Sequence, residues 1–170
     1  MSLLRVLSSL AVLMIAGTAA AADVRAPFKV TIIARLTFAE VRVVDGDTLA
    51  LNGVRIRLWG IDAPEMDNEA GELAQSTLAV MLTAAGELRC YPQDEDRYGR
   101  AVMICLDADG RDIAERMVSE GLARDWPEYS KGHYELTEAA ARLLHRGFWS
   151  CSPKTVPGWE AKKREVCPAP

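Results

Sequence analysis

The sequence predicts an α+β domain built from short strands and three helices. Six segments carry β-branched or alternating apolar residues between turn residues, which is typical of strands: 28–33, 38–44, 48–51, 54–58, 88–91 and 101–106. Asn52 and Gly53 separate two of these segments and favour a two-residue hairpin, because both residue types tolerate positive φ. Three other segments show helical periodicity.

The first helix is expected over residues 69–84, which are rich in Ala, Glu and Leu. One of its faces carries residues spaced three to four apart: Leu73, Thr77, Val80 and Ala84. The second helix is expected to begin at Asp112, whose side chain can cap it, with Glu115 completing a capping box. Gly121 is expected to end that helix, and Asp109-Gly110 precedes it as a tight turn.

The third helix is expected over residues 134–146 and is closed by Gly147. Its apolar residues are expected to face inward: Leu136, Ala140, Leu143 and Leu144. Short strands that close on themselves, with helices outside, would form a small barrel of the OB type. The sequence pattern by itself goes no further than α+β.

Residues 1–22 have the layout of a secretory signal peptide. Arg5 precedes an apolar stretch from Val6 to Ala16, and small residues end at Ala22, so cleavage before Asp23 is expected. The alternative is an uncleaved anchor, but 11 apolar residues are far fewer than the ~20 that span a bilayer. We expect an exported protein, periplasmic or secreted and free of the membrane, with a domain over 23–150 and a tail over 151–170.

Four cysteines in an exported chain suggest two disulfides, and four allow three connectivities. We favour Cys90–Cys105, which flanks residues 96–100 as two hairpin strands would, and Cys151–Cys167, which would tie down the tail. The alternative of a zinc site is disfavoured because the sequence contains no Cys-x-x-Cys pair.

Three short segments carry the residues with the most chemical potential: 45–48 (Asp-Gly-Asp-Thr), 57–65 (Arg-Leu-Trp-Gly-Ile-Asp-Ala-Pro-Glu) and 96–100 (Asp-Arg-Tyr-Gly-Arg). Asp47 and Asp62 offer the hard oxygen atoms that Ca²⁺ prefers. Arg57 and Arg100 offer planar forks that suit phosphate. Each segment also has an ordinary interpretation: a capped turn, a solvated Glu65, or an ion pair of Arg100 with Asp94 or Asp96.

In this order, the three segments resemble the thermonuclease family, also called the staphylococcal-nuclease-like family. The resemblance extends from about Val41 to Trp149 and includes the punctuating Gly and Pro residues. It implies a five-stranded OB-type barrel with three packed helices. It also implies a Ca²⁺-dependent hydrolase that cleaves DNA and RNA with little sequence specificity and leaves 3′-phosphate ends.

The resemblance also implies roles for individual residues. Asp47, Asp62 and the carbonyl of Ala63 would hold Ca²⁺. Glu65 would position or deprotonate the attacking water, and Arg57 and Arg100 would bind the phosphate as charge develops on it. For the substrate we expect further contacts from Arg97 and Tyr98, and base stacking on Tyr129 or Trp126.

The substrate is expected to be single-stranded or frayed nucleic acid, and the protein a monomer. The formal net charge is −4, and it becomes −5 once residues 1–22 are removed with their single Arg, which argues against a broad basic surface. Only three residues, 66–68, separate Glu65 from the first helix, where the best-studied family member has a longer, Lys-rich loop. The alternative is a catalytically silent OB-fold module of the periplasm that binds nucleic acid or protein; silent superfamily members generally lack this acidic and arginine set.

Overall fold

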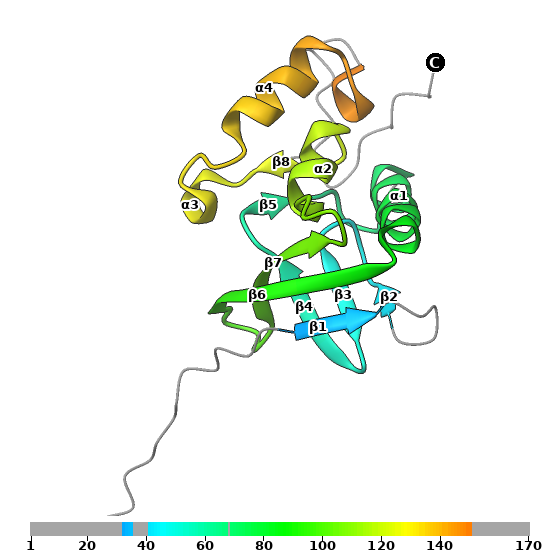
Figure 1. The fold of residues 1–170 in the computed structure, drawn as a ribbon. Coiled ribbons are helices and arrows are strands. Elements are labelled where there is room, and N and C mark those ends of the chain that lie inside the picture. Colours follow the sequence, from blue (N-terminus) through cyan, green and yellow to red (C-terminus); the bar gives the residue numbers. More distant parts are fainter. Residues whose placement is uncertain (1–31, 36–40, 68, 151–170) are drawn as a thin grey trace, which may run out of the picture.

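The computed structural model describes residues 32–35, 41–67 and 69–150 (Figure 1). Six strands form one sheet in the order β1-β6-β7-β4-β3-β2. Their bounds are β1 Ile32–Arg35, β2 Val41–Val43, β3 Thr48–Leu51, β4 Val54–Leu58, β6 Glu87–Glu95 and β7 Ala101–Asp107. All neighbouring strands are antiparallel except β4 and β7, which are parallel.

A second, two-stranded sheet pairs β5 (Ile61–Asp62) with β8 (Arg124–Asp125). It lies between the large sheet and the upper helices in Figure 1. The helices are α1 Glu69–Ala85, α2 Ile113–Ser119, α3 Pro127–Ser130 and α4 Glu135–Leu143, followed by the 3₁₀ helix η1 Gly147–Ser150. The predicted α+β class is therefore confirmed.

The large sheet must curl, because its two edge strands are neighbours in the sequence. Arg35 and Val41 bound the edge strands β1 and β2, and six chain steps span at most about 20 Å. In a flat sheet, five gaps of ~4.8 Å would place these edges about 24 Å apart. No pairing joins β1 to β2 among the described residues, so the closed five-stranded barrel stays a prediction from the family.

The hairpin between β3 and β4 is confirmed. Asn52 and Gly53 both have positive φ, at 49° and 82°, and the register pairs Leu51 with Val54 across the turn. The strands predicted over 48–51 and 54–58 have the same bounds in the structure. Those predicted over 88–91 and 101–106 are present but longer, and the strand predicted over 38–44 is present as the shorter β2. The strand predicted over 28–33 lies mostly outside the described residues, and the short strands β5 and β8 were not predicted.

Helix α1 forms where it was predicted, but the predicted apolar stripe is not its buried face. Leu73 and Val80 are exposed. The buried face lies beside them and is made largely of small residues: Ala70, Gly71, Ala74, Leu78, Met81, Leu82 and Ala85. Small side chains let the helix axis come close to the sheet, a consequence that periodicity alone does not reveal.

The predicted cap of α2 is confirmed, because the Asp112 side chain accepts a hydrogen bond from the Ala114 backbone N–H at 2.8 Å. The hydroxyl of the buried Tyr134 donates to the same carboxylate, also at 2.8 Å. Burial raises the pKa of Asp112, and the hydrogen bonds from Tyr134 and the backbone oppose that effect. The cap therefore also ties α2 to the start of α4.

Helix α4 forms, but the prediction that its leucines face inward is wrong. Leu136, Leu143 and Leu144 are exposed, and the buried residue of the helix is Ala141. Polar contacts hold the inner side instead: the Glu138 carboxylate accepts from the Asp125 backbone N–H at 2.6 Å. Helical periodicity identifies an apolar face but not whether a neighbour covers it. The short helix α3, with Pro127 at its first turn, was also missed.

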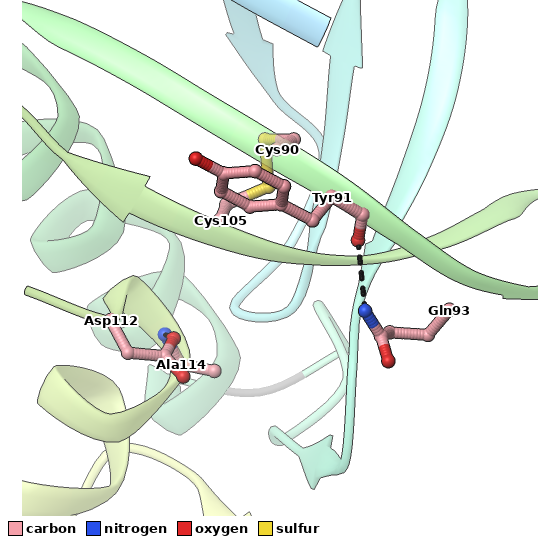
Figure 2. The surroundings of a disulfide bond; sticks show 6 residues. All are labelled: Cys90, Tyr91, Gln93, Cys105, Asp112 and Ala114. Atoms are coloured by element: carbon pink, nitrogen blue, oxygen red, sulfur yellow. Dashed lines mark hydrogen bonds between the residues drawn. A yellow bond between two sulfur atoms is a disulfide. The ribbon is translucent and has the colours of Figure 1, made fainter. Parts of the chain in front are cut away.

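The predicted disulfide Cys90–Cys105 is confirmed (Figure 2). The two cysteines are paired residues in the register of β6 and β7, and the bond is buried in the hydrophobic core. The predicted disulfide Cys151–Cys167 lies outside the described residues. In the part of the chain that the structure describes, no helix is both long and apolar enough to cross a membrane.

Candidate active site

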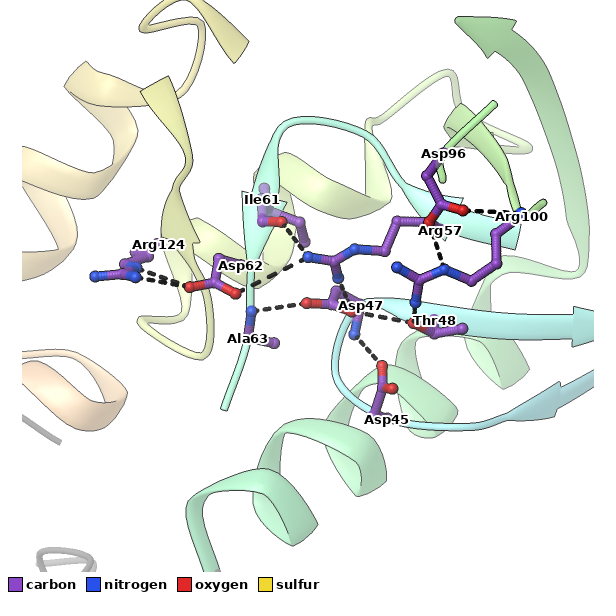
Figure 3. Close-up of polar contacts among 10 residues, drawn as sticks. All are labelled: Asp45, Asp47, Thr48, Arg57, Ile61, Asp62, Ala63, Asp96, Arg100 and Arg124. Atoms are coloured by element: carbon purple, nitrogen blue, oxygen red, sulfur yellow. Dashed lines mark hydrogen bonds and ion pairs between the residues drawn. The ribbon is translucent and has the colours of Figure 1, made fainter. Parts of the chain in front are cut away.

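Asp47 lies at the start of β3, where its carboxylate connects three segments (Figure 3). One oxygen, Oδ2, accepts the Ala63 backbone N–H at 2.8 Å. The other oxygen, Oδ1, accepts the Thr48 hydroxyl at 3.1 Å and forms an ion pair with Arg57. Asp47 is 6% exposed, so this carboxylate is a buried acceptor with its partners in place.

Gly46 makes the position of Asp47 possible. A Cβ atom at residue 46 would lie 2.7 Å from the Cβ atoms of both Ala63 and Ala74, which is closer than carbon atoms pack. The Asp-Gly-Asp turn therefore fits against α1 and against the residue after β5 only because residue 46 has no side chain. The small Ala63 is part of the same fit.

Arg57, at the end of β4, is the centre of the cluster. Its Nη2 donates to the Ile61 carbonyl at 2.9 Å and lies 3.9 Å from Asp62 Oδ1. Burial lowers the pKa of Arg57 from its ordinary value, and Asp62 opposes that effect. The charges of Arg100, Asp45 and Glu65 also act on this guanidinium. The structure therefore brings Arg57, Asp47 and Asp62 together, with Arg100 and Glu65 close enough for their charges to act on the guanidinium.

Arg100 comes from the loop between β6 and β7, and its Nε donates to Asp96 Oδ2 at 2.6 Å. This is the loop ion pair that the sequence left open. Burial by itself would raise the pKa of Asp96, but hydrogen bonds from the Arg100 backbone and side chain hold it below its usual value. Arg100 Nη1 also reaches the Thr48 hydroxyl at 3.4 Å, so Thr48 bridges Arg100 to Asp47.

Arg124 was missed by the sequence analysis. From β8, its Nε and Nη2 both contact Asp62 Oδ2, at 2.9 Å and 2.8 Å. The antiparallel pairing of β5 and β8 places Asp62 directly opposite Arg124. The two residues are 62 positions apart, so no local sequence signal could have found this contact.

Glu65 is exposed, and it lies immediately before the turn that leads into α1. A Cβ atom at Gly71 would fall 1.9 Å from the Glu65 carbonyl oxygen and 2.5 Å from its carbonyl carbon. The first turn of α1 therefore packs directly on the Glu65 backbone. This close contact fixes the position of the Glu65 backbone relative to α1, while the residue itself remains exposed to solvent.

A cleft of about 770 Å³ opens beside Arg57 and Arg100. Its lining includes all four of the residues predicted to contact substrate: Arg97, Tyr98, Trp126 and Tyr129. The Arg97 and Arg100 guanidiniums lie 4.9 Å and 5.6 Å from the centre of the Tyr98 ring. Trp126 and Tyr129 pack edge to face at 4.6 Å. The cleft thus combines cationic and aromatic groups with acidic ones: Asp94, Glu95, Asp96 and Glu128.

The donors present suit a hard cation that keeps several waters. Within the described residues, no group of three or more His, Cys, Asp or Glu side chains is placed to hold a metal. Asp47 and Asp62 nevertheless both contact the guanidinium of Arg57, through different nitrogens. Ca²⁺ also accepts backbone carbonyl and water ligands, and two carboxylates with the Ala63 carbonyl match that chemistry.

The family model described as staphylococcal nuclease homologue matches residues 55–151 of this chain. The chain belongs to this family. The matched range includes Arg57, Asp62, Glu65 and Arg100 and also the newly located Arg124. Recognition of the family from the three segments is therefore confirmed.

Named relatives share about a third of their residues with this chain. A succinoglycan biosynthesis protein, ExoI, of Rhizobium meliloti is 33% identical over 68% of this chain and 65% of its own length. A probable staphylococcal-like nuclease, CAN1, of rice is 34% identical over 77% of this chain and 39% of its own length. A micrococcal nuclease of Shigella flexneri is 33% identical over 72% of this chain and 78% of its own. The match thus covers less than two thirds of the first two relatives.

Proposed function

We propose that this family member is an exported, Ca²⁺-dependent nuclease that hydrolyses phosphodiester bonds of DNA and RNA with little sequence specificity. The observation that carries the proposal is the gathering of charged side chains around Arg57. The buried guanidinium of Arg57 contacts Asp47 and Asp62, and the charges of Arg100 and Glu65 also act on its pKa. A structural ion pair needs one acid, whereas this cluster assembles two arginines and three acids beside an open cleft.

In the proposed mechanism, Arg57 and Arg100 bind the scissile phosphate through their planar forks. Both guanidiniums line the cleft, so an extended chain in it would present a phosphate to them. Their contacts should strengthen as negative charge grows on the phosphate oxygens. Glu65, which is exposed to solvent, would orient the attacking water or remove its proton.

Asp47, Asp62 and the Ala63 carbonyl would hold Ca²⁺. When bound, the ion would supply positive charge against the phosphate and an ordered water. In the described structure, both carboxylates form ion pairs with arginines: Asp47 with Arg57 and Asp62 with Arg124. The fixed hydrogen bond from the Ala63 N–H to Asp47 keeps that carboxylate oriented whichever cation faces it.

The cleft supports a single-stranded or frayed substrate. Tyr98 and Tyr129 are exposed and can stack on bases without reading sequence. With few cationic side chains in the cleft, few phosphates are neutralised, so affinity should fall gently with salt, with a slope of about −0.7 per phosphate contact on single strands. The names of the rice and Shigella relatives support a nuclease, and the resemblance supports 3′-phosphate ends.

The alternative is a silent module that binds nucleic acid or protein. One observation favours it: Arg57, Arg100, Asp47 and Asp62 are already paired with one another or with neighbours, as in a purely structural network. The two proposals differ in one measurement, the hydrolysis of denatured DNA.

The test uses purified full-length mature protein and denatured DNA, with Ca²⁺ and with chelator. We expect cleavage that chelator abolishes and that yields 3′-phosphate termini. Matched single- and double-stranded oligonucleotides across a salt series then test the substrate preference. Tight binding of DNA without cleavage, at any Ca²⁺ concentration, would favour the silent module.

The metal ligands are tested by calorimetry of Ca²⁺ binding to Asp47→Asn and Asp62→Asn. Each substitution removes one charge from the site, so affinity should fall, while Asp109→Asn, an exposed carboxylate on a distant turn, should match the wild type. Mg²⁺ should substitute poorly because it demands tight octahedral geometry. Equal Ca²⁺ affinity in the wild type and Asp47→Asn would rule out the proposed site.

A further inference from the structure

The face of β4 that is turned away from the core carries two arginines. Successive side chains of a strand point to opposite faces of its sheet, and Ile56 and Leu58 lie in the hydrophobic core. Arg55 and Arg57 therefore lie on the opposite face. Arg57 is buried in the charged cluster of the candidate active site, whereas Arg55 is exposed to solvent.

This face extends across β3 to β2. The register pairs Ala50 with Arg55 and also with Arg42, and directly paired residues of antiparallel strands lie on the same face. Arg42 is exposed, and the small side chain of Ala50 separates it from Arg55. Thr48, two positions before Ala50, lies on this face as well, and the Arg100 side chain reaches its hydroxyl at 3.4 Å (Figure 3). The Arg100 guanidinium therefore lies on the same face.

Three of these arginines are neighbours across the strands. The parallel pairing of β4 with β7 places Ile56 opposite Ala101, so Arg55 lies beside Arg100, which precedes Ala101. Neighbouring strands are ~4.8 Å apart, and Arg42 lies two strands beyond Arg55. Arg100, Arg55 and Arg42 thus form a line, the arginine row, which begins at the proposed phosphate site and runs toward the edge strand β2.

The two outer members of the row are charges without a partner. Within the described ranges of the chain, the side chains of Arg42 and Arg55 form no hydrogen bond or ion pair, and β2, β3 and β4 contain no acidic residue. The acid beside the inner end of the row is Asp96, which is paired with Arg100. A charge on an edge strand can also prevent pairing with another chain, which would explain Arg42 but not Arg55 on an inner strand.

We propose that the arginine row binds the phosphates that flank the scissile phosphate of a single-stranded nucleic acid. The inference rests on the proposed nuclease function, which places the scissile phosphate at Arg57 and Arg100. Planar guanidiniums suit phosphate oxygens. A strand that leaves the cleft past Arg100 meets Arg55 next and then Arg42.

The charge distribution of the protein favours this path. Asp94, Glu95 and Glu128 line the cleft and repel further phosphates inside it, and the full chain has a net charge of −4. The strands that carry Arg55 and Arg42 contain no acid. The row therefore gives an acidic protein a local surface for phosphate, with one contact from each of these two arginines beyond those in the cleft.

Fluorescence anisotropy with a labelled oligothymidylate tests the row in the full mature chain. Chelator keeps the strand intact, so binding is measured over a salt series without hydrolysis. A phosphate contact on a single strand contributes about −0.7 to the slope of log affinity against log salt. Arg42→Gln and Arg55→Gln should each make the slope shallower by about 0.7, and the double variant by about 1.4.

Two controls separate phosphate contacts from other effects. Arg55→Lys keeps the charge and should keep most of the slope, which a loss caused by altered packing would not. Arg146→Gln removes the same charge from an exposed position after α4 and should leave the slope unchanged. Because Arg42 and Arg55 are exposed, the melting temperature of their variants should match that of the wild type.

Hydrolysis in Ca²⁺ gives an independent measurement. A dinucleotide carries only the phosphate that is cleaved, whereas an oligonucleotide also reaches Arg55 and Arg42. The ratio of kcat/KM for the oligonucleotide to kcat/KM for the dinucleotide should therefore fall about fivefold in each Gln variant at about 0.1 M salt, the contribution of one contact relative to about 1 M salt. Arginines that only support the fold would lower both values together.

A wild-type slope in both Arg42→Gln and Arg55→Gln would overturn the proposal, and the two arginines would then be solvated charges. An equal loss of slope in Arg146→Gln would also overturn it, because overall charge would explain the effect. If the wild type cleaves no substrate while the slopes fall as expected, the nuclease function fails, and the row is supported as the binding surface of a silent module.

Discussion

Arg124 contacts a single oxygen of Asp62 through two of its nitrogens, at 2.9 Å and 2.8 Å. The other oxygen of the same carboxylate faces Arg57 at 3.9 Å. A carboxylate held on one side in this way cannot turn freely, so Arg124 is placed to set the direction in which Asp62 presents its second oxygen. Contacts of this kind, behind a metal ligand, commonly affect metal affinity or activity by about 10–100-fold.

Replacing Arg124 with Gln should therefore lower Ca²⁺ affinity and turnover by about 10–100-fold. Arg124→Lys should recover only part of either loss, because an ammonium group cannot reproduce the two-nitrogen contact. Calorimetry and initial rates measure the two effects. Arg146→Gln, at an exposed arginine after α4, serves as the control and should change neither. Unchanged Ca²⁺ affinity in Arg124→Gln would show that Arg124 does not orient Asp62 for metal binding.

Alanine substitutions of Arg57, Glu65 and Arg100 should each reduce turnover by about 10²–10³-fold, the usual cost of losing one preorganised electrostatic group. Arg100→Lys should be severely impaired as well, because a point charge does not replace the planar fork. Circular dichroism should show a retained fold, and Arg146→Ala should keep wild-type rates. Near-normal hydrolysis by a folded Glu65→Ala protein would contradict the mechanism.

Substituting Gly71 with Ala should reduce both stability and activity. Alanine normally favours a helix over glycine by about 1 kcal/mol, but here the new Cβ would lie 1.9 Å from the Glu65 carbonyl oxygen. Overpacking of this kind costs about 1–3 kcal/mol, and it would displace Glu65 together with the first turn of α1.

Urea unfolding and initial rates measure these two effects of Gly71→Ala. The comparison is Ser76→Ala, an exposed site on the same helix, which should be neutral or slightly stabilising. A Gly71→Ala protein that is more stable than the wild type and fully active would show that α1 can shift without moving Glu65.

Asp107 should make the stability of the protein depend on pH. Its side chain is 1% exposed, and it accepts from the Arg111 backbone at 2.9 Å and from the Arg111 side chain at 2.8 Å. Burial would raise the pKa of Asp107, but these hydrogen bonds hold it below the usual carboxyl value. The charged carboxylate therefore stabilises the fold above the unfolded pKa of about 4, and this contribution is lost as the pH falls through the lower folded pKa.

Asp107→Asn should destabilise the protein at pH 7 by about 1.5–3 kcal/mol, the range for hydrogen bonds to charged groups. The difference from the wild type should shrink below about pH 4. Urea unfolding at pH 7, 5, 4 and 3 measures it. Asp109→Asn, whose side chain is 70% exposed, should differ little from the wild type at any of these values. If the loss of stability in Asp107→Asn grows as the pH falls, the pKa of Asp107 is not lowered in the folded protein.

Local patterns determined several features of this protein. The Asn52-Gly53 hairpin, the Asp112 cap and the confirmed Cys90–Cys105 disulfide depend on neighbouring residues or on a short hairpin, so the sequence contains their physical causes. The three segments that identify the family could also be recognised from the sequence alone. The residue types that bind phosphate and hard cations are few, and their spacing here is distinctive.

Other features were decided only by the tertiary structure. The contact of Arg124 with Asp62, the bridge from Arg100 through Thr48 to Asp47, and the approach of Gly71 to Glu65 all join residues that other elements bring together. Periodicity found α4 and its apolar face but placed Leu136 and Leu143 inward. Amphipathic spacing records that one face is apolar, whereas burial depends on which surfaces the rest of the chain places beside it.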